Sequence, residues 1–251
     1  MKTFIKDNKT LTIIGILLLI FLWWLISIII DERTLIFPGP VESFKDLFRL
    51  LSLKSTYISI FTTLYKMILG YFISIILALI FGVLSGVNKY IEKILNPTII
   101  ALKAVPTASL IYLFIVLSSF EHAPIFVVIL VAFPILYDSV VGGIKNIPSS
   151  INEAMMLDSK NNLKSIAKIK LPIASSYILV GIASSFGLAF KVEIMSEVIS
   201  GATGYGIGSS IQLIQSSEIS MVPIFSWTII AVIILLIINI FSTLIKNKLT
   251  K

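Results

Sequence analysis

The sequence predicts an all-helical membrane protein with six transmembrane helices, the fold class that two features of its composition indicate. Hydrophobic residues make up 57% of the chain and charged residues only 13%, about half of the roughly 25% that soluble domains carry. Uncharged runs close to the ~20 residues that a membrane helix needs recur along the chain. The sequence does not show the repeated ten-residue segments of alternating polarity that a membrane β-barrel would need.

The predicted spans follow these apolar runs in order. The first run, about Leu11–Ile30, follows several lysines, but it is too long for a signal peptide and ends without a small-residue cleavage site, so we interpret it as a membrane helix. The second span covers about Tyr57–Val87 and contains the uncharged run Met67–Asn88. The later runs are Ala104–Phe120, His122–Tyr137, Leu171–Phe190 and Ile219–Ile245.

The lysines in the short loops predict the topology. With the N-terminus in the cytoplasm, nearly all loop lysines lie inside and the later outer loops contain no Lys or Arg, as the positive-inside rule requires. Both termini are therefore expected in the cytoplasm, and the net charge of +7 reflects topology rather than nucleic-acid binding. The inside lysines are Lys2, Lys6, Lys9, Lys89, Lys93, Lys145, Lys160, Lys164, Lys168, Lys170, Lys246, Lys248 and Lys251.

The segment between the first two spans predicts a short amphipathic helix. Phe37-Pro38-Gly39-Pro40 breaks the first helix. Apolar residues then repeat at helical spacing, which suits a helix lying on the outer membrane interface or packed on the protein's own outer surface; these residues are Val41, Phe44, Leu47, Phe48 and Leu51. We divide the chain into an N-terminal helix and outer segment, residues 1–56, and a core of residues 57–251 that contains the loop near residues 144–171.

Glycine and proline residues predict close packing within the core. Gly82 and Gly86 form a Gly-x-x-x-Gly pair that permits close helix approach. The third span is expected to start near Pro97, with Pro106 in its first half, and the fourth near Pro124, with Pro134 inside it. Proline kinks a membrane helix where neighbouring helices or a cavity satisfy the freed carbonyl groups. Spans two to five are therefore expected to form a kinked bundle, with spans one and six peripheral.

The longest loop on the lysine-rich side, about residues 144–171, predicts two short helices. Ser150-Ile151-Asn152-Glu153 has capping-box spacing. Asn161 can cap a second helix that Pro172 would end. Ala154, Met155 and Leu157 would leave a modest apolar knob suited to a groove in a partner protein. An ordinary surface loop, with lysines placed only by topology, is the alternative.

This loop resembles the Glu-Ala-Ala loop of binding-protein-dependent ABC transporter permeases. Glu153, Ala154, Ile169 and Leu171-Pro172 fall on that pattern at the right spacing, whereas Met155 replaces its second alanine and Ser159 its glycine. The resemblance covers about Leu35 to Gln212. Within the family, the chain is similar to the nitrate, sulfonate and taurine branch. The further matching segments are Leu35–Pro40, Leu69–Phe72, Lys103–Pro106, Phe133–Leu136, Gly187–Lys191 and Ser196–Val198.

The resemblance implies a type I importer permease in the bacterial inner membrane. It implies a dimer, with a second copy of the chain, around one path for a small solute such as a sulfonate, taurine, nitrate or a vitamin precursor. An external solute-binding protein would deliver the solute. Cytoplasmic ATPases would bind ATP and Mg²⁺ and contact the loop, since this chain has no Gly-x-x-x-x-Gly-Lys-Ser/Thr motif and is not expected to be an enzyme. The implied coupling residues are Glu153, Ala154, Met155, Leu157, Ser159, Leu171 and Pro172.

Charged residues in the spans mark candidate positions on the path, because such charges usually face a bundle interior or a cavity. Lys66 and Lys103 lie near span ends, where they can extend to the interface. Asp138 is expected to pair with another helix. Lys191 and Glu197 lie deeper, and we expect at least one of them to border the path, with a structural ion pair as the alternative.

Other classes of function lack the residues they need. Without cysteine and with one histidine, no metal cluster or catalytic cluster is expected, and His122 is interpreted as a surface residue. Residues 201–208 contain four glycines that predict a tight turn or a partly re-entrant connection, not a dinucleotide loop. A secondary transporter driven by an ion gradient remains the alternative function; it would predict inverted repeats, which the sequence does not show clearly.

Overall fold

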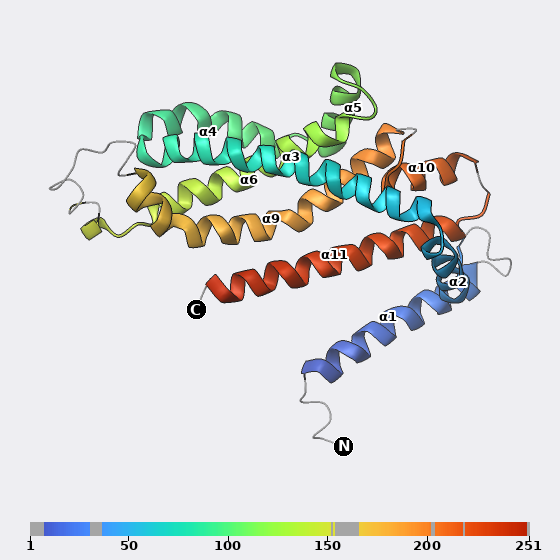
Figure 1. The fold of residues 1–251 in the computed structure, drawn as a ribbon. Helices are drawn as coiled ribbons and strands as arrows, with labels where there is room; N and C mark the ends of the chain where they lie inside the picture. Colours follow the sequence, from blue (N-terminus) through green and yellow to red (C-terminus); the bar gives the residue numbers. More distant parts are fainter. Residues whose placement is uncertain are drawn as a thin grey trace.

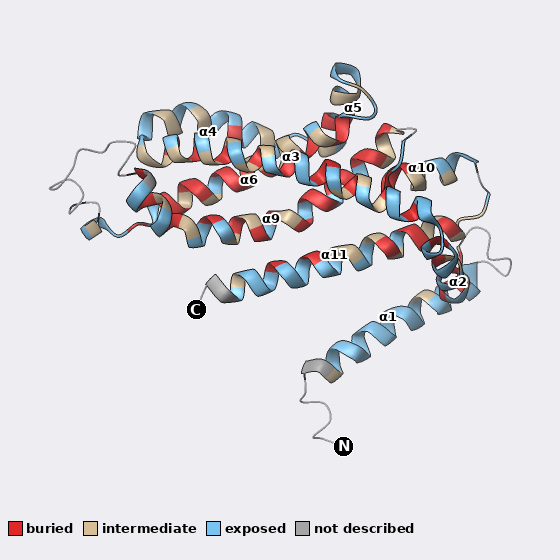
Figure 2. Ribbon diagram, viewed as in Figure 1, coloured by how far each residue is buried: buried red, intermediate tan, exposed pale blue. Residues whose placement is uncertain are grey.

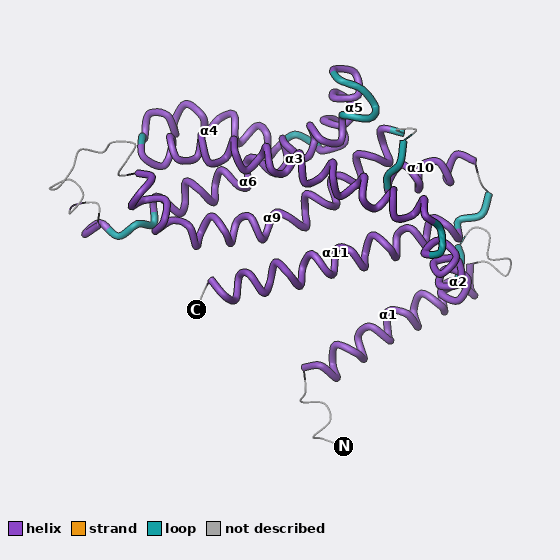
Figure 3. Tube along the Cα trace, in the orientation of Figure 1, coloured by secondary structure: helices purple, strands orange, loops and turns teal. Residues whose placement is uncertain are grey.

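The computed structural model describes residues 8–30, 37–151, 153, 166–201, 204–217 and 219–249. These residues are almost entirely helical, without a strand in any of those ranges (Figure 3). The elements in chain order are α1 (Asn8–Ile30), α2 (Pro40–Leu51), α3 (Lys54–Val87), α4 (Lys89–Ala104), α5 (Thr107–Leu117), α6 (Ala123–Lys145), the π-helix η2 (Ile166–Lys170), α9 (Leu171–Ser200), α10 (Ile207–Ser217) and α11 (Val222–Leu249).

Five of these helices are long and apolar enough to cross a membrane. The bent pair α4 and α5 would count as a sixth span if the two helices together form one span. The all-helical membrane prediction is confirmed, and the third span is broken more sharply than the proline kink expected there. It divides at Val105-Pro106, where α4 and α5 meet at 99°. Proline drives the preceding residue out of the helical region, and Val105 has the extended angles φ −68° and ψ 127°. Pro97, the expected start, lies inside α4, which begins at the Asn88 cap.

Helices α3, α6 and α9 form the centre of the molecule, with α5 against one end and α11 along the outside (Figure 1). The glycine prediction is confirmed. A Cβ added at Gly82 would lie 2.7 Å from Val140 Cβ, and one at Gly86 would lie 2.9 Å from Ile144 Cβ. Both contacts fall on α6, so the Gly-x-x-x-Gly pair sets the close approach of α3 and α6.

Helices α1 and α11 are peripheral, as expected. Most of their residues are exposed, whereas buried residues concentrate on α3, α6 and α9 (Figure 2). Many of their apolar side chains are exposed, which suits helices that face lipid. The densest helix packing therefore lies among α3, α6 and α9.

Helix α2 combines the two alternatives for the outer segment. One face packs on the protein, where Ser43 Oγ donates to Gly39 O and Ser226 Oγ of α11 donates to Ser43 O. The opposite face exposes Val41 and Phe48, at 63% and 69%. The predicted apolar residues divide between the two faces, because Leu47 is buried (5% exposed) while Val41 and Phe48 point outward.

The loop of residues 144–171 leaves and re-enters the bundle at the end opposite to α2 and α10 (Figure 1). A helical turn begins at Ser149, close to the predicted capping box. The expectation that Pro172 ends a helix was wrong. η2 continues directly into α9, where Pro172 occupies one of the first two positions, and a missing N–H is harmless there because those donors have no intrahelical acceptor.

Candidate functional site

A buried junction of charged residues joins α3, α9 and α10. Glu193 and Glu197 of α9 are both 0% exposed, and Lys66 of α3 is 8% exposed. Lys66 Nζ lies 4.0 Å from Glu197 Oε1. The expectation that Lys66 extends to the interface was wrong, because its ammonium group has a carboxylate partner inside the bundle. Burying both charges costs several kcal/mol unless other polar groups satisfy them.

Glu197 has the hydrogen bonds that such burial requires. Thr63 Oγ1 lies 2.9 and 3.0 Å from the two carboxylate oxygens, and Gly208 N donates to Oε2 at 2.9 Å. Ile207 N donates to Thr63 Oγ1 at 2.8 Å. Two of the backbone donors at the start of α10 thus reach acceptors supplied by other helices. Glu197 acts as a cap for α10 and ties three helices together.

Glycines in the segment before α10 make this contact possible. A Cβ at Gly206 would lie 2.6 Å from Glu197 Oε1, and a Cβ at Gly208 would collide with Ile194 O. Gly201 ends α9 with φ +63°, a left-handed conformation that favours glycine. The expected tight turn is present, whereas α10 itself was not predicted from the sequence. Its mixed polarity gives only a weak helical signal.

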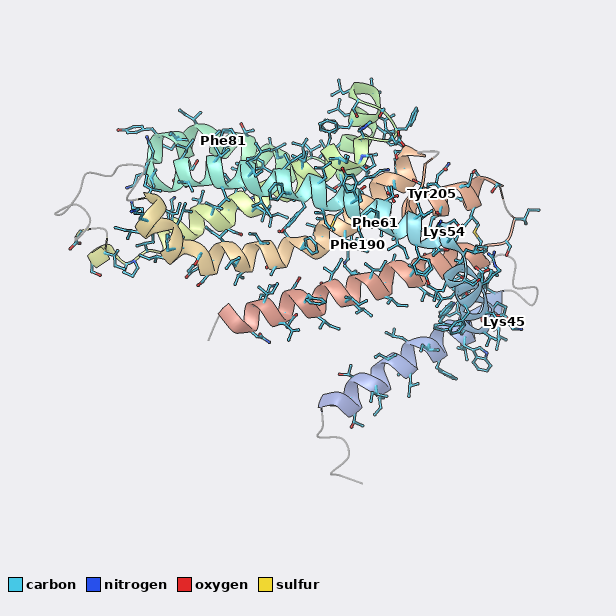
Figure 4. The ribbon with its side chains drawn as sticks, in the orientation of Figure 1. Lys45, Lys54, Phe61, Phe81, Phe190 and Tyr205 are labelled. Atoms are coloured by element: carbon cyan, nitrogen blue, oxygen red, sulfur yellow. The ribbon has the colours of Figure 1, made fainter. Side chains whose placement is uncertain are left out.

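Glu193 differs from Glu197, one turn away on the same helix. Its two oxygens are buried without a hydrogen-bond partner in the described part of the chain, and the same holds for Ser196 Oγ and Ser209 Oγ. Ser209 lines a cavity of about 520 Å³ beside the start of α3, the 201–205 turn and α10. Tyr205 of that cavity lies at the end of the molecule that also carries Lys45 and Lys54 (Figure 4).

The other predicted path residues lie on the surface. Asp138 of α6 pairs with Lys103 of α4, in agreement with the expected helix pairing. A second ion pair joins Lys145 Nζ and Glu92 Oε1 of the same two helices at 2.6 Å. Lys191 is exposed on α9, and the pairing with another helix considered for it does not occur among the described residues. The structure therefore does not bring Asp138, Lys191 and Glu197 together.

The predicted coupling residues lie largely outside the described residues. Ala154, Met155, Leu157 and Ser159 fall there. Glu153 and Pro172 are exposed, and Leu171 is half-buried at the start of α9. His122 is exposed beside Ser119, whose Oγ lies 2.9 Å from its Nδ1, as a surface residue should be. No group of three or more metal-ligating side chains occurs among the residues with described positions.

Known proteins resemble this chain over much of its length. A trimethylamine N-oxide transport system permease of Pelagibacter ubique is 29% identical over 57% of this chain, which spans 20% of that protein. An aliphatic sulfonates transport permease of Bacillus subtilis is 30% identical over 75% of this chain and 68% of its own. A nitrate import permease of Leptolyngbya laminosa is 30% identical over 57% of this chain, which spans about half of that relative (52%).

The fold is shared with solved transporters. A crystal structure described as an amino acid ABC transporter with histidines matches 83% of this chain and 96% of its own, with a TM-score of 0.63 and 16% identity. The family described as binding-protein-dependent transport system inner membrane component matches residues 70–251, which include α6, α9, α10 and Glu197 but not Thr63 and Lys66. The chain belongs to that family of ABC transporter permeases and is a multi-pass protein of the inner membrane.

Proposed function

We propose that this protein is one permease subunit of an ATP-driven importer for a small organic or inorganic anion, with a vitamin precursor as the other substrate considered. Two copies form the translocation path, an external solute-binding protein delivers the solute, and two cytoplasmic ATPases bind the loops of residues 144–171. Relatives named for sulfonates and nitrate support the anionic substrate class.

One observation carries the coupling part of the proposal. The loop joins α6 to α9, and these two helices pack closely against each other. A Cβ at Gly143 would lie 3.0 Å from Tyr177 Cβ and 3.1 Å from Ala174 O. Gly181 lies against Ser139 further along the same seam. Because packed helices shift as units rather than deform continuously, a displacement of the loop moves both helices.

In this proposal the loop contacts the ATPase through Glu153, Ala154, Met155, Leu157 and Ser159, while Leu171 and Pro172 fix the entry into α9. An apolar knob in a groove of a partner is a common mode of helix recognition. The ATPases bind ATP and Mg²⁺, and the permease supplies the path.

Co-purification tests the proposal. Ala154→Asp puts a charge into the apolar contact and is expected to lower the amount of ATPase recovered with the permease by about tenfold or more, which corresponds to about 1.4 kcal/mol. Lys89→Ala is the matched control, because Lys89 is exposed at the same end of the bundle, at the start of α4. Unchanged recovery of the ATPase contradicts the coupling role. Uptake that continues in cells without the ATPase supports the secondary-transporter alternative.

A further inference from the structure

Glu193 is a buried acidic residue without the hydrogen bonds that a buried carboxylate needs. Its side chain is 0% exposed, and neither carboxyl oxygen has a hydrogen-bond partner among the described residues. Glu197, one turn later, is equally buried but accepts hydrogen bonds from Thr63 and Gly208. The two glutamates lie on the same face of α9, yet all of these donors are directed at one of them.

The junction supplies one ammonium group for two carboxyl groups. Lys66 Nζ pairs with Glu197 Oε1 at 4.0 Å, and no ion pair joins it to Glu193 in the described ranges. Both charged groups still interact with Glu193, the repulsive Glu197 more strongly than the attractive Lys66. Residues four positions apart on a helix have Cβ atoms about 5–6 Å apart, so two ionised glutamates would repel each other inside the packed bundle.

No other charged side chain with a described position compensates Glu193. Besides η2, which precedes it, the helices packed against α9 are α3, α5, α6, α10 and α11. Helix α10 contains no titratable residue, and α5 contains only the exposed Tyr112. Asp138 and Lys145 of α6 pair with α4, and Lys191, about 200° around α9 from Glu193, is exposed. The remaining titratable side chains described on these helices are neutral tyrosines or lysines near helix ends, namely Lys54, Tyr57, Tyr65, Tyr71, Tyr137 and Lys246.

The distribution of donors indicates which glutamate carries the negative charge. A buried carboxylate requires a counter-charge and hydrogen bonds, and an ionisable group that has neither is neutralised instead. Glu197 has both, so it balances Lys66. A metal ion could also compensate Glu193, but the described residues contain no group of three or more His, Asp or Glu that could hold one. The counter-charge that remains for Glu193 is a proton.

We propose that Glu193 is a proton-binding site inside the bundle, and that the packing of α3, α9 and α10 seen here is its proton-bound form. The carboxylate takes up one proton from water and becomes a neutral carboxylic acid, and no other bond changes. Opening of the junction to water lets the group ionise, so the packing of these helices is linked to pH. The proposal goes beyond the importer function and does not depend on it.

Infrared spectroscopy of the purified full-length chain tests the protonation state directly. A protonated carboxyl group has a carbonyl stretching band that carboxylates and amides lack. Exposed Asp and Glu side chains are ionised at neutral pH, so a band that remains there comes from a buried carboxylic acid. We expect this band in the wild type and in Glu121→Gln, the control with an exposed carboxyl group replaced, and we expect its loss in Glu193→Gln.

Thermal unfolding gives a second readout that depends on the same proton. Between about pH 5 and neutral pH an unfolded chain has released the proton of Glu193, whereas the folded chain of the proposal keeps it. Raising the pH by one unit then lowers the folding equilibrium constant of the wild type about tenfold relative to Glu193→Gln, a fall of about 3–5 °C in the unfolding midpoint. Glutamine has the shape of the neutral acid and brings no charge, so this variant is expected to fold.

Each result bears on the proposal by itself. Absence of the infrared band from the wild type at neutral pH overturns it without any variant, and so does a band that persists at unchanged intensity in Glu193→Gln. Midpoints of the wild type and Glu193→Gln that change in parallel with pH also overturn it. A wild-type midpoint that rises with Na⁺ at constant ionic strength, and not with acidity, assigns a metal cation to the carboxylate in place of the proton.

Discussion

Replacing Glu197 tests whether the buried junction holds the bundle together. Glu197→Ala removes the acceptor of Thr63 Oγ1 and of Gly208 N, and it leaves Lys66 without its 4.0 Å partner. Breaking a buried ion pair by removing one partner costs about 3–5 kcal/mol. For a chain of this size each kcal/mol corresponds to about 2–4 °C, so we expect the midpoint of thermal unfolding to fall by about 6–20 °C.

Two control variants separate the possible causes. Glu197→Gln keeps one acceptor oxygen for Gly208 N and loses the charge and the second acceptor oxygen, so a smaller loss of about 1–2 kcal/mol is expected than for Glu197→Ala. Lys191→Gln removes a charge from the exposed face of the same helix and is expected to change stability by less than about 0.5 kcal/mol. The measurement is the unfolding midpoint of purified protein in detergent. A Glu197→Ala midpoint within about 2 °C of the wild type would refute the junction as a stabilising element.

Two other predictions follow from the packing. Gly206→Ala places a Cβ 2.6 Å from Glu197 Oε1 and is expected to destabilise the protein by about 1–3 kcal/mol in the same thermal assay. Gly142→Ala is the control, because a Cβ there meets nothing within 4 Å. Lys103→Asp and Asp138→Lys are each expected to lower the free energy of unfolding by less than about 1 kcal/mol, because both side chains are about half exposed. The double variant restores an ion pair with the charges exchanged and should recover that loss. A double variant whose loss equals the sum of the two single losses contradicts a direct pair.

Patterns within single segments predicted the helices well, because the backbone hydrogen bonds of a helix form within the segment itself. The apolar runs located the long helices, and Gly82 and Gly86 correctly indicated a close helix contact. The sequence placed Pro134 inside a helix, as observed. It could not predict the 99° bend at Pro106, because proline permits anything from a slight kink to a break, and the neighbouring helices determine the angle.

The candidate site, too, was only partly predictable from the sequence. The sequence did not distinguish Lys191 from Glu197, because both are charged residues within one apolar helix. The fold distinguishes them, since Glu197 bonds to Thr63 and Gly208 from other segments while Lys191 is exposed. The pairing of Lys66 with Glu197 joins positions 131 residues apart, and nothing in the spacing of either segment indicates it.

The sequence by itself determined that this chain is a helical, multi-pass membrane permease with a lysine-rich loop of its family's kind. Hydrocarbon excludes charge and unsatisfied backbone, so a count of apolar residues and the placement of lysines suffice for that much. Only the tertiary structure decided which intramembrane charges are internal supports and which face outward. That distinction depends on the direction of each side chain around its helix and on the neighbours that it meets there, and both are fixed by packing.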